Sequence, residues 1–177
     1  MFDAYLTLSD RELIGTLDFY VLKTTQEDLK KNEVNLTIPE VCKRAFEGDA
    51  LVISTLLINS IIRKTDVTPQ EIMQLREADT KNDKKKIGEC FIKIFDYLKE
   101  LFEACFPTEE FKPCVDDDDE ALFEDEFEDE KDYDFATMEY MWITYLHRND
   151  FWETTPKKYI EQIQIFSKHA LKNKARG

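Results

Sequence analysis

The sequence predicts a mainly α protein, in which an N-terminal β-hairpin packs on a helical bundle and an acidic linker leads to a small C-terminal helical module. Three observations support this fold class. Only four glycines and five prolines occur among 177 residues, so few turns are obligatory. Two segments carry complete helix-start signatures. One block, residues 116–134, contains thirteen acidic residues against one lysine and supplies 12 of the 14 net negative charges.

The first 21 residues carry the alternating pattern of a hairpin. Residues 4–8 alternate, residues 9–12 are polar, and Leu17, Phe19 and Val21 alternate again with more polar neighbours. Two strands are marginal without a helix to lie on, so we expect the hairpin to pack against the helices that follow. The polar segment 26–33 is interpreted as a short helix or a turn.

Helix starts are marked at Thr37 and Thr68. Each threonine is followed by a proline in the first turn and by a glutamate three residues on. This is the capping box, in which the hydroxyl accepts from a backbone N–H and the glutamate returns a bond to the N–H of the cap. Gly48 predicts the end of the first of these helices, and Asp49 predicts the cap of the next.

Two longer helices are expected next. Residues 50–64 are apolar on nearly every side, which predicts a helix in the centre of a bundle, with a strand over 56–62 as the alternative. Residues 83–105 show apolar side chains at steps of three and four, which predicts a long amphipathic helix. The apolar positions of this helix are Ile87, Cys90, Phe91, Ile94, Phe95, Leu98, Leu101, Phe102 and Cys105.

The acidic block predicts a solvated connector between two parts. Like charges at this density repel one another, and the block offers too little apolar surface to offset the entropy of ordering. We therefore predict an N-terminal helical domain over 1–112, a flexible acidic linker over 113–134 and a two-helix module over 135–177. A short helix around Phe123 and Phe127 that docks on a basic surface is the alternative for the linker.

The C-terminal module is short for an independent fold. An aromatic-rich helix is predicted from Phe135 to about Asn149, and Thr155 with Pro156 predicts the start of a last helix. About 43 residues usually need a metal, disulfides or a partner to hold a fold. Aromatic anchors for a partner, or alternatively the residues of a self-contained core, are Trp142, Tyr145, Phe151 and Trp152.

Charge distribution predicts an attraction between the basic tail and the acidic linker. From Lys157 onward six basic residues face one glutamate, which gives the tail a charge of about +5 beside the acidic linker. The two segments can attract each other within one chain, so a true partner would have to displace the linker. No apolar run approaches the length that spans a bilayer, no signal peptide is visible, and we expect neither a membrane nor a nucleic-acid partner.

Catalytic and metal-binding signatures are missing from the sequence. The two histidines, His147 and His169, belong to no HExxH pair, the glycines form no phosphate-binding loop, and the four cysteines match neither a CxxC pair nor a disulfide framework. In the acidic block, Ala121 stands where a calcium loop starting at Asp116 needs glycine. We therefore expect a protein without enzymatic activity, cofactor or metal, whose cysteines are reduced and mostly buried.

The order of these parts resembles that of the tail assembly chaperones of long-tailed bacteriophages, which have a short hairpin, a helical body, an acidic connector and a small C-terminal helical module. The resemblance spans most of the chain. It is carried by residues 6–8 (LTL) and 17–19 (LDF), by 46–49 (FEGD) leading into 51–62, by 67–72 (VTPQEI) and by 151–157 (FWETTPK).

This resemblance implies a function in assembly. In that family the N-terminal domain coats the tape-measure protein, and a programmed ribosomal frameshift appends the module that recruits tail-tube subunits. It implies that this chain is the longer product, acting in the cytoplasm of the infected bacterium. A tape-measure protein is a helical rod with apolar faces, which an apolar groove can cover. Phe91, Phe95 and Phe102 are the candidates for this groove, with an intramolecular core as the alternative.

Two other binding functions stay open. Spaced carboxylates can imitate phosphates, so an acidic DNA mimic that inhibits a nucleic-acid-binding protein is the main alternative. Deletion of residues 116–134 separates the two hypotheses, because a mimic loses its activity whereas a chaperone domain still binds its helical client. A toxin-antitoxin or immunity-type binding protein has no specific sign in the sequence. Whether the chain forms a homo-oligomer is also open.

Overall fold

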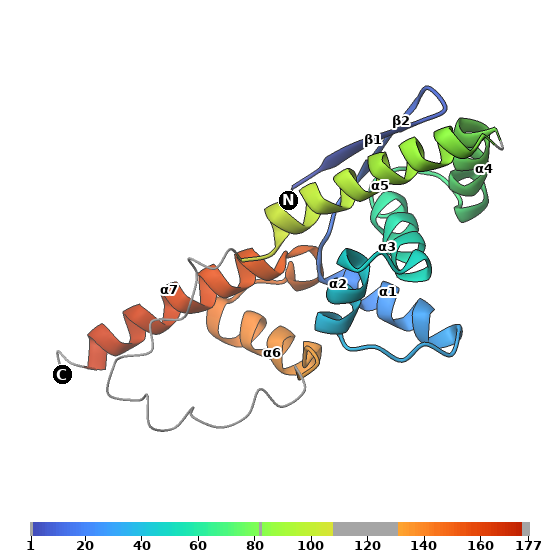
Figure 1. Cartoon of the computed structure of the whole chain (residues 1–177). Helices are drawn as coiled ribbons and strands as arrows, with labels where there is room; N and C mark the ends of the chain where they lie inside the picture. The colour runs from blue at the N-terminus through green and yellow to red at the C-terminus, as the bar shows by residue number, and fades with distance from the viewer. Residues whose placement is uncertain (1, 82, 108–130, 175–177) are drawn as a thin grey trace.

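The computed structural model describes residues 2–81, 83–107 and 131–174, and it confirms the predicted fold class (Figure 1). An N-terminal antiparallel hairpin is followed by helices throughout the described chain. The elements are β1 (Ala4–Leu8), β2 (Arg11–Gly15), α1 (Phe19–Lys31), α2 (Ile38–Phe46), α3 (Ala50–Ile62), α4 (Pro69–Thr80), α5 (Lys84–Cys105), α6 (Phe135–Leu146), the 3-10 helix η3 (Phe151–Glu153) and α7 (Pro156–Lys174).

The second strand lies earlier than the alternation of Leu17, Phe19 and Val21 predicts, and that prediction was wrong. Ser9 and Asp10 both adopt positive φ, at 48° and 64°, as a two-residue hairpin turn requires, so β2 begins directly after them. Residues 19–31 instead form α1, and the predicted polar helix or turn is its C-terminal half. The helix starts there because the carboxylate of its N-cap residue accepts from a backbone N–H in its first turn.

The predicted helix starts are confirmed. Thr37 and Thr68 both form the complete capping box with proline in the first turn. Gly48 follows α2 with a φ of 87°, a conformation that favours glycine. Asp49 then caps α3 by accepting from the N–H groups of the first turn. These local bonds set the sharp angle between α2 and α3.

The predicted central helix is α3, and the strand alternative for 56–62 does not occur. Its buried residues contact α1, α2, α5 and β2. Gly15 at the end of β2 has a packing reason, because a Cβ there would lie 3.0 Å from the Ser60 backbone and would clash with the hydroxyl of Tyr97. The long amphipathic helix is also confirmed as α5, with Asp83 as its N-cap.

Residues 131–174, here named the C-terminal segment, pack against α1. The ring of Phe151 stacks on Phe19 with centroids 4.8 Å apart, and the Phe19 N–H donates to the Thr154 carbonyl at 3.0 Å. Asp132 accepts from the N–H of Ile38 at 2.8 Å, which ties the start of the segment to α2. The segment and the helices before it share one hydrophobic cluster. Apart from residues 131–134, the predicted acidic linker, including Phe123 and Phe127, lies outside the described residues.

No single helix in the described ranges is long and apolar enough to cross a membrane. The pair α2 and α3 reaches the required length and composition only together, and a bend of 110° separates the two. Cys90 and Cys105 are buried free thiols, Cys42 is half-buried, and Cys114 lies outside the described residues.

Candidate protein-binding surface

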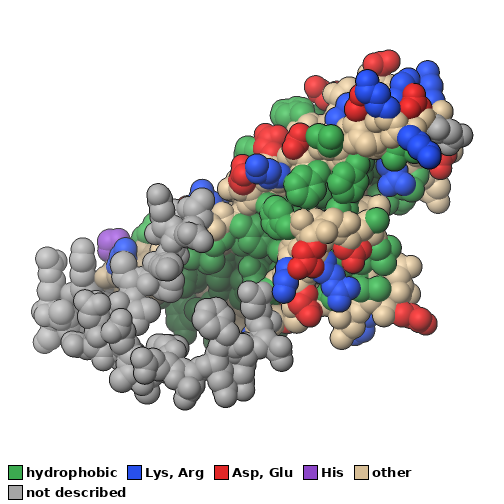
Figure 2. Space-filling view, in the orientation of Figure 1, with side chains coloured by type: hydrophobic (Ala, Val, Ile, Leu, Met, Phe, Trp, Pro, Cys, Tyr) green, Lys and Arg blue, Asp and Glu red, His purple; other side chains and the backbone are tan. Residues whose placement is uncertain are grey.

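One side of α5 exposes a row of aromatic and aliphatic side chains. Phe91 is 43% exposed, Ile87 is 49% exposed, and Phe46 from the end of α2 is 51% exposed. The ring centroids of Phe91 and Phe95 lie 6.3 Å apart, and those of Phe46 and Phe95 lie 6.5 Å apart. We name Phe46, Ile87, Phe91 and Phe95 the α5 aromatic surface. Figure 2 shows hydrophobic side chains gathered along α5 and continuing toward α2.

The periodicity of α5 explains why this row is exposed. The buried positions of the helix form one stripe: Cys90, Ile94, Tyr97, Leu98, Leu101, Phe102 and Cys105. Ile87 and Phe91 lie at the edge of this stripe, where the neighbouring helices no longer cover them. Phe46 lies one position beyond the buried Ala45, next to the turn at Gly48. Two elements, α5 and α2, therefore place apolar side chains at one surface without burying them.

A groove of about 340 Å³ continues this surface between α4, α5 and the start of α3. Its walls include Ile87, Phe91, Ile94 and the thiol of Cys90, and Arg76 with Glu77 provides charged groups at the same place. Burial raises the pKa of Cys90, so the thiol stays protonated and acts as a small apolar group. The groove is thus mainly apolar, with one positive and one negative side chain beside it.

The three predicted protein-binding residues of α5 lie in different environments. Phe91 is exposed, Phe95 is half-buried, and Phe102 is buried at 5% exposure with its ring 4.9 Å from that of Phe46. Phe102 therefore supports the surface from beneath. Phe46 was not predicted from the sequence, although its place just outside the buried stripe of α2 and before Gly48 was a usable signal.

The four predicted C-terminal anchors have different environments. Trp142 and Phe151 are buried, at 0% and 1% exposure, and contact residues of this chain. Trp152 is half-buried, and its indole donates to Glu139 at 2.8 Å. Tyr145 is 46% exposed and packs beside Phe166. Of these four, only Tyr145 is exposed and so available to a partner.

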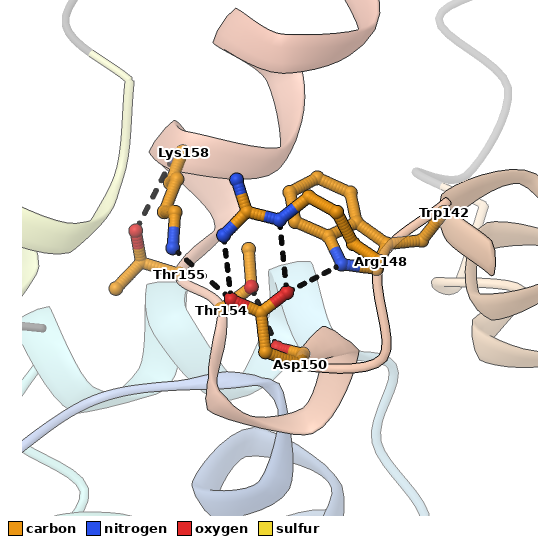
Figure 3. Close-up of polar contacts among 6 residues, drawn as sticks. All are labelled: Trp142, Arg148, Asp150, Thr154, Thr155 and Lys158. Atoms are coloured by element: carbon orange, nitrogen blue, oxygen red, sulfur yellow. Dashed lines mark hydrogen bonds and ion pairs between the residues drawn. The ribbon is translucent and has the colours of Figure 1, made fainter. Parts of the chain in front are cut away.

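A polar network around Asp150 holds the turn between α6 and α7 (Figure 3). Its carboxylate accepts from the indole N–H of Trp142 at 3.0 Å and from Arg148 at 3.0 and 2.6 Å, and Lys158 lies 3.5 Å away. The hydroxyl of Thr154 donates to the Asp150 carbonyl. These bonds, first among them those from Arg148, hold the pKa of Asp150 well below its ordinary value. The sequence analysis missed this residue.

Replacing Asp150 with asparagine is expected to destabilise the protein in a pH-dependent way. The folded state lowers this pKa, so the carboxylate contributes its full stabilisation above about pH 4 and loses it as the pH falls toward the folded-state value. Charge-assisted hydrogen bonds are worth about 2 kcal/mol, and we expect about 1 kcal/mol because a third of the side chain is exposed.

Urea unfolding of the wild type and Asp150→Asn at pH 7 and at pH 3 measures this difference. The gap between the two proteins should narrow at the lower pH, because protonation of the unfolded state has begun there. The matched control is Glu153→Gln, an exposed carboxylate of the same segment. A gap that stays constant with pH would show that Asp150 acts without its charge.

Comparison with protein-family models, curated proteins and solved structures finds no match for this chain. Across the residues that the structure describes, no three His, Cys, Asp or Glu side chains gather in a way that could hold a metal ion. The most prominent candidate site in this part of the chain is therefore an exposed apolar surface, which offers contacts suited to binding another protein.

Proposed function

We propose that this chain is a non-enzymatic assembly chaperone that covers an apolar face of a helical client with its α5 aromatic surface. The observation that carries the proposal is the exposure of Phe46, Ile87 and Phe91 beside an apolar groove. Contiguous apolar side chains on the surface of a soluble domain mark protein-interaction sites. An amphipathic helix binds such a groove through apolar residues spaced three and four apart.

The geometry suits a client that is helical along its length. The apolar side chains follow α5 over about two helical turns, from Ile87 to Phe95, and Phe46 extends the surface sideways onto α2. Such an elongated surface can contact several turns of one client helix. Arg76 and Glu77 at the groove can pair with charges of either sign on the polar flanks of the client.

On the resemblance to phage tail assembly chaperones, we propose that the client is the tape-measure protein, which this chain would keep soluble in the cytoplasm of the infected bacterium. The C-terminal segment would recruit tail-tube subunits. Its support is a pair of exposed rings, Tyr145 of α6 and Phe166 of α7, whose centroids lie 5.5 Å apart. Because the C-terminal segment packs against α1, it keeps a fixed position relative to that helix. One chain would therefore hold the tape-measure protein and the tail-tube subunits close together.

Replacing both Phe46 and Phe91 with serine is expected to abolish the solubilising activity. Both rings are about half exposed, so each replacement should lower the free energy of unfolding by only about 1 kcal/mol, half or less of the value for a fully buried ring. Losing two aromatic anchors should weaken client binding by at least about tenfold. The measurement is the soluble fraction of a tape-measure protein co-expressed with the wild type or the variant.

The matched control is Tyr140→Ser, which removes an exposed aromatic ring from α6 and should leave the tape-measure protein soluble. Equal solubility with the wild type and the double variant would contradict the proposed surface. If the wild type itself fails to keep any tape-measure protein soluble, the chaperone function is contradicted as well.

A further inference from the structure

One edge of the hairpin is covered by α3 and the turn that follows it. In an antiparallel pair, the backbone groups of successive residues point alternately toward the partner strand and away from it. Ile14 of β2 points away, because its N–H donates to Thr65 Oγ1 at 3.0 Å and its carbonyl accepts from the same hydroxyl at 2.8 Å. The Thr16 N–H likewise donates to the Ser60 carbonyl. The outer edge of β2 therefore has partners.

The same register leaves the outer edge of β1 open. Tyr5 pairs with Ile14, and Thr7 follows in the same alternation, so the N–H and C=O groups of Tyr5 and Thr7 point away from β2. Within the described part of the chain these groups have no hydrogen-bond partner. The edge ends at Ser9, whose N–H donates to the Asp79 carboxylate of α4 at 3.2 Å.

A groove of about 370 Å³ runs beside this open edge. It lies between residues 5–7 of β1 and the side chains of Lys93, Asp96, Tyr97 and Glu100 of α5. Lys93 is held by Asp79 at 3.1 Å, and the Tyr97 hydroxyl shares a hydrogen bond with Ser60. Asp96 and Glu100 have no ion-pair partner among the described residues, so the groove presents two available negative charges.

We propose that this groove binds an extended basic peptide, which adds to the hairpin as a third strand beside β1. The two N–H and two C=O groups of Tyr5 and Thr7 supply the main-chain hydrogen bonds of strand addition. Side chains of an added strand alternate between two faces. Those on the α5 side lie toward Asp96 and Glu100, where lysine or arginine pairs with them.

This groove is distinct from the α5 aromatic surface. Asp96, Tyr97 and Glu100 lie on another face of α5 than Phe91 and Phe95, because neighbouring positions of a helix point in different directions. A peptide in the groove and a helical client on the aromatic surface can therefore be bound together. The two proposals can fail independently.

Amide hydrogen exchange in the full-length protein, followed by NMR, tests the proposal. The probe is an eight-residue peptide of alternating threonine and lysine, and the control is the same peptide N-methylated at the amides of one edge. The control carries the same charge and so reports binding to acidic residues elsewhere in the chain. We expect the lysine peptide to slow exchange at Tyr5 and Thr7 by at least about tenfold, and the N-methylated peptide to leave it unchanged.

Two variants sharpen the test. Thr7→Pro removes an N–H that makes no bond to β2, so the hairpin should form as proline is tolerated on strand edges, while the protection at Tyr5 should disappear. The double variant Asp96→Lys with Glu100→Lys should shift the preference to a threonine–glutamate peptide, and Glu103→Lys on the same helix should not.

Three outcomes overturn the proposal. The first is exchange at Tyr5 and Thr7 that the lysine peptide does not slow. The second is equal protection by the N-methylated peptide. The third is slow exchange at both residues in the protein alone, which would show that another occupant, such as a second copy of the chain, already covers this edge.

Discussion

Replacing Phe151 with alanine is expected to lower the free energy of unfolding by about 3 to 5 kcal/mol and to release the C-terminal segment from α1. Phe151 is 1% exposed and lies among aromatic rings. It stacks on Phe19 and meets Trp152 and Tyr159 edge to face. Alanine leaves a cavity that these large rings cannot fill without losing their contacts with one another.

Hydrogen exchange distinguishes release of the segment from general destabilisation. The N–H of Phe19 donates to the carbonyl of Thr154, so its exchange should accelerate with that of residues 135–163, while β1 and α3 change less. The matched control is Tyr145→Ala, an exposed ring of the same segment, for which we expect a loss below about 1 kcal/mol. If Phe151→Ala also lowers the free energy of unfolding by less than about 1 kcal/mol, the segment is held mainly by other contacts.

This docking also explains how a short C-terminal segment holds its fold. A two-helix unit of this length usually needs a metal, disulfides or a partner to hold its fold. Its partner is α1 of the same chain, through Phe19. Nothing in the local sequence predicts this pairing, because Phe19 and Phe151 are far apart in the chain and each is also compatible with a local role. Pairing between distant residues leaves no periodic signal.

Local signals in contrast predicted most helices correctly. Capping boxes at Thr37 and Thr68 and the caps at Asp49 and Asp83 specify helix starts through bonds within a few residues, so the sequence alone contains them. The prediction of a strand at residues 17–21 was wrong because the alternation there fits a strand as well as the first turn of a helix. The cap bond of one buried residue, Asp18, decides between the two.

The α5 aromatic surface could be predicted only in part from the sequence. A hydrophobic stripe identifies the apolar side of α5, but it does not show where the neighbouring helices end. Phe91 and Phe102 belong to the same stripe, and the placement of the neighbouring elements leaves the first exposed and the second buried. The boundary of a binding surface therefore depends on tertiary packing.

Replacing Asp18 with alanine is expected to cost about 2 to 4 kcal/mol. The Asp18 side chain is fully buried, accepts from the Val21 N–H at 2.9 Å and pairs with Arg63 at 3.0 Å. Alanine removes the cap of α1 and so leaves the buried Val21 N–H and the Arg63 guanidinium without the Asp18 carboxylate as their partner. We place the loss below the full value for a buried pair because a quarter of the Arg63 side chain is exposed. Urea unfolding measures it.

A double-mutant cycle separates the cap from the ion pair. Asp18→Asn keeps an oxygen for the Val21 N–H, so it should cost less than Asp18→Ala. Combining Asp18→Ala with Arg63→Met should cost less than the sum of the two single changes, because neither partner then remains unpaired. Strict additivity would contradict the pairing.

Asp18 and Asp150 should respond to pH in opposite directions. Burial raises the pKa of Asp18 in spite of its hydrogen bonds, so the folded state binds this proton more tightly than the unfolded state. As the pH rises from below about 4, the free energy of unfolding of the wild type should therefore fall relative to that of Asp18→Asn. Over the same pH range it should rise relative to that of Asp150→Asn. Unfolding free energies of the three proteins between pH 3 and pH 7 measure both trends. Parallel trends would show that burial does not dominate at Asp18.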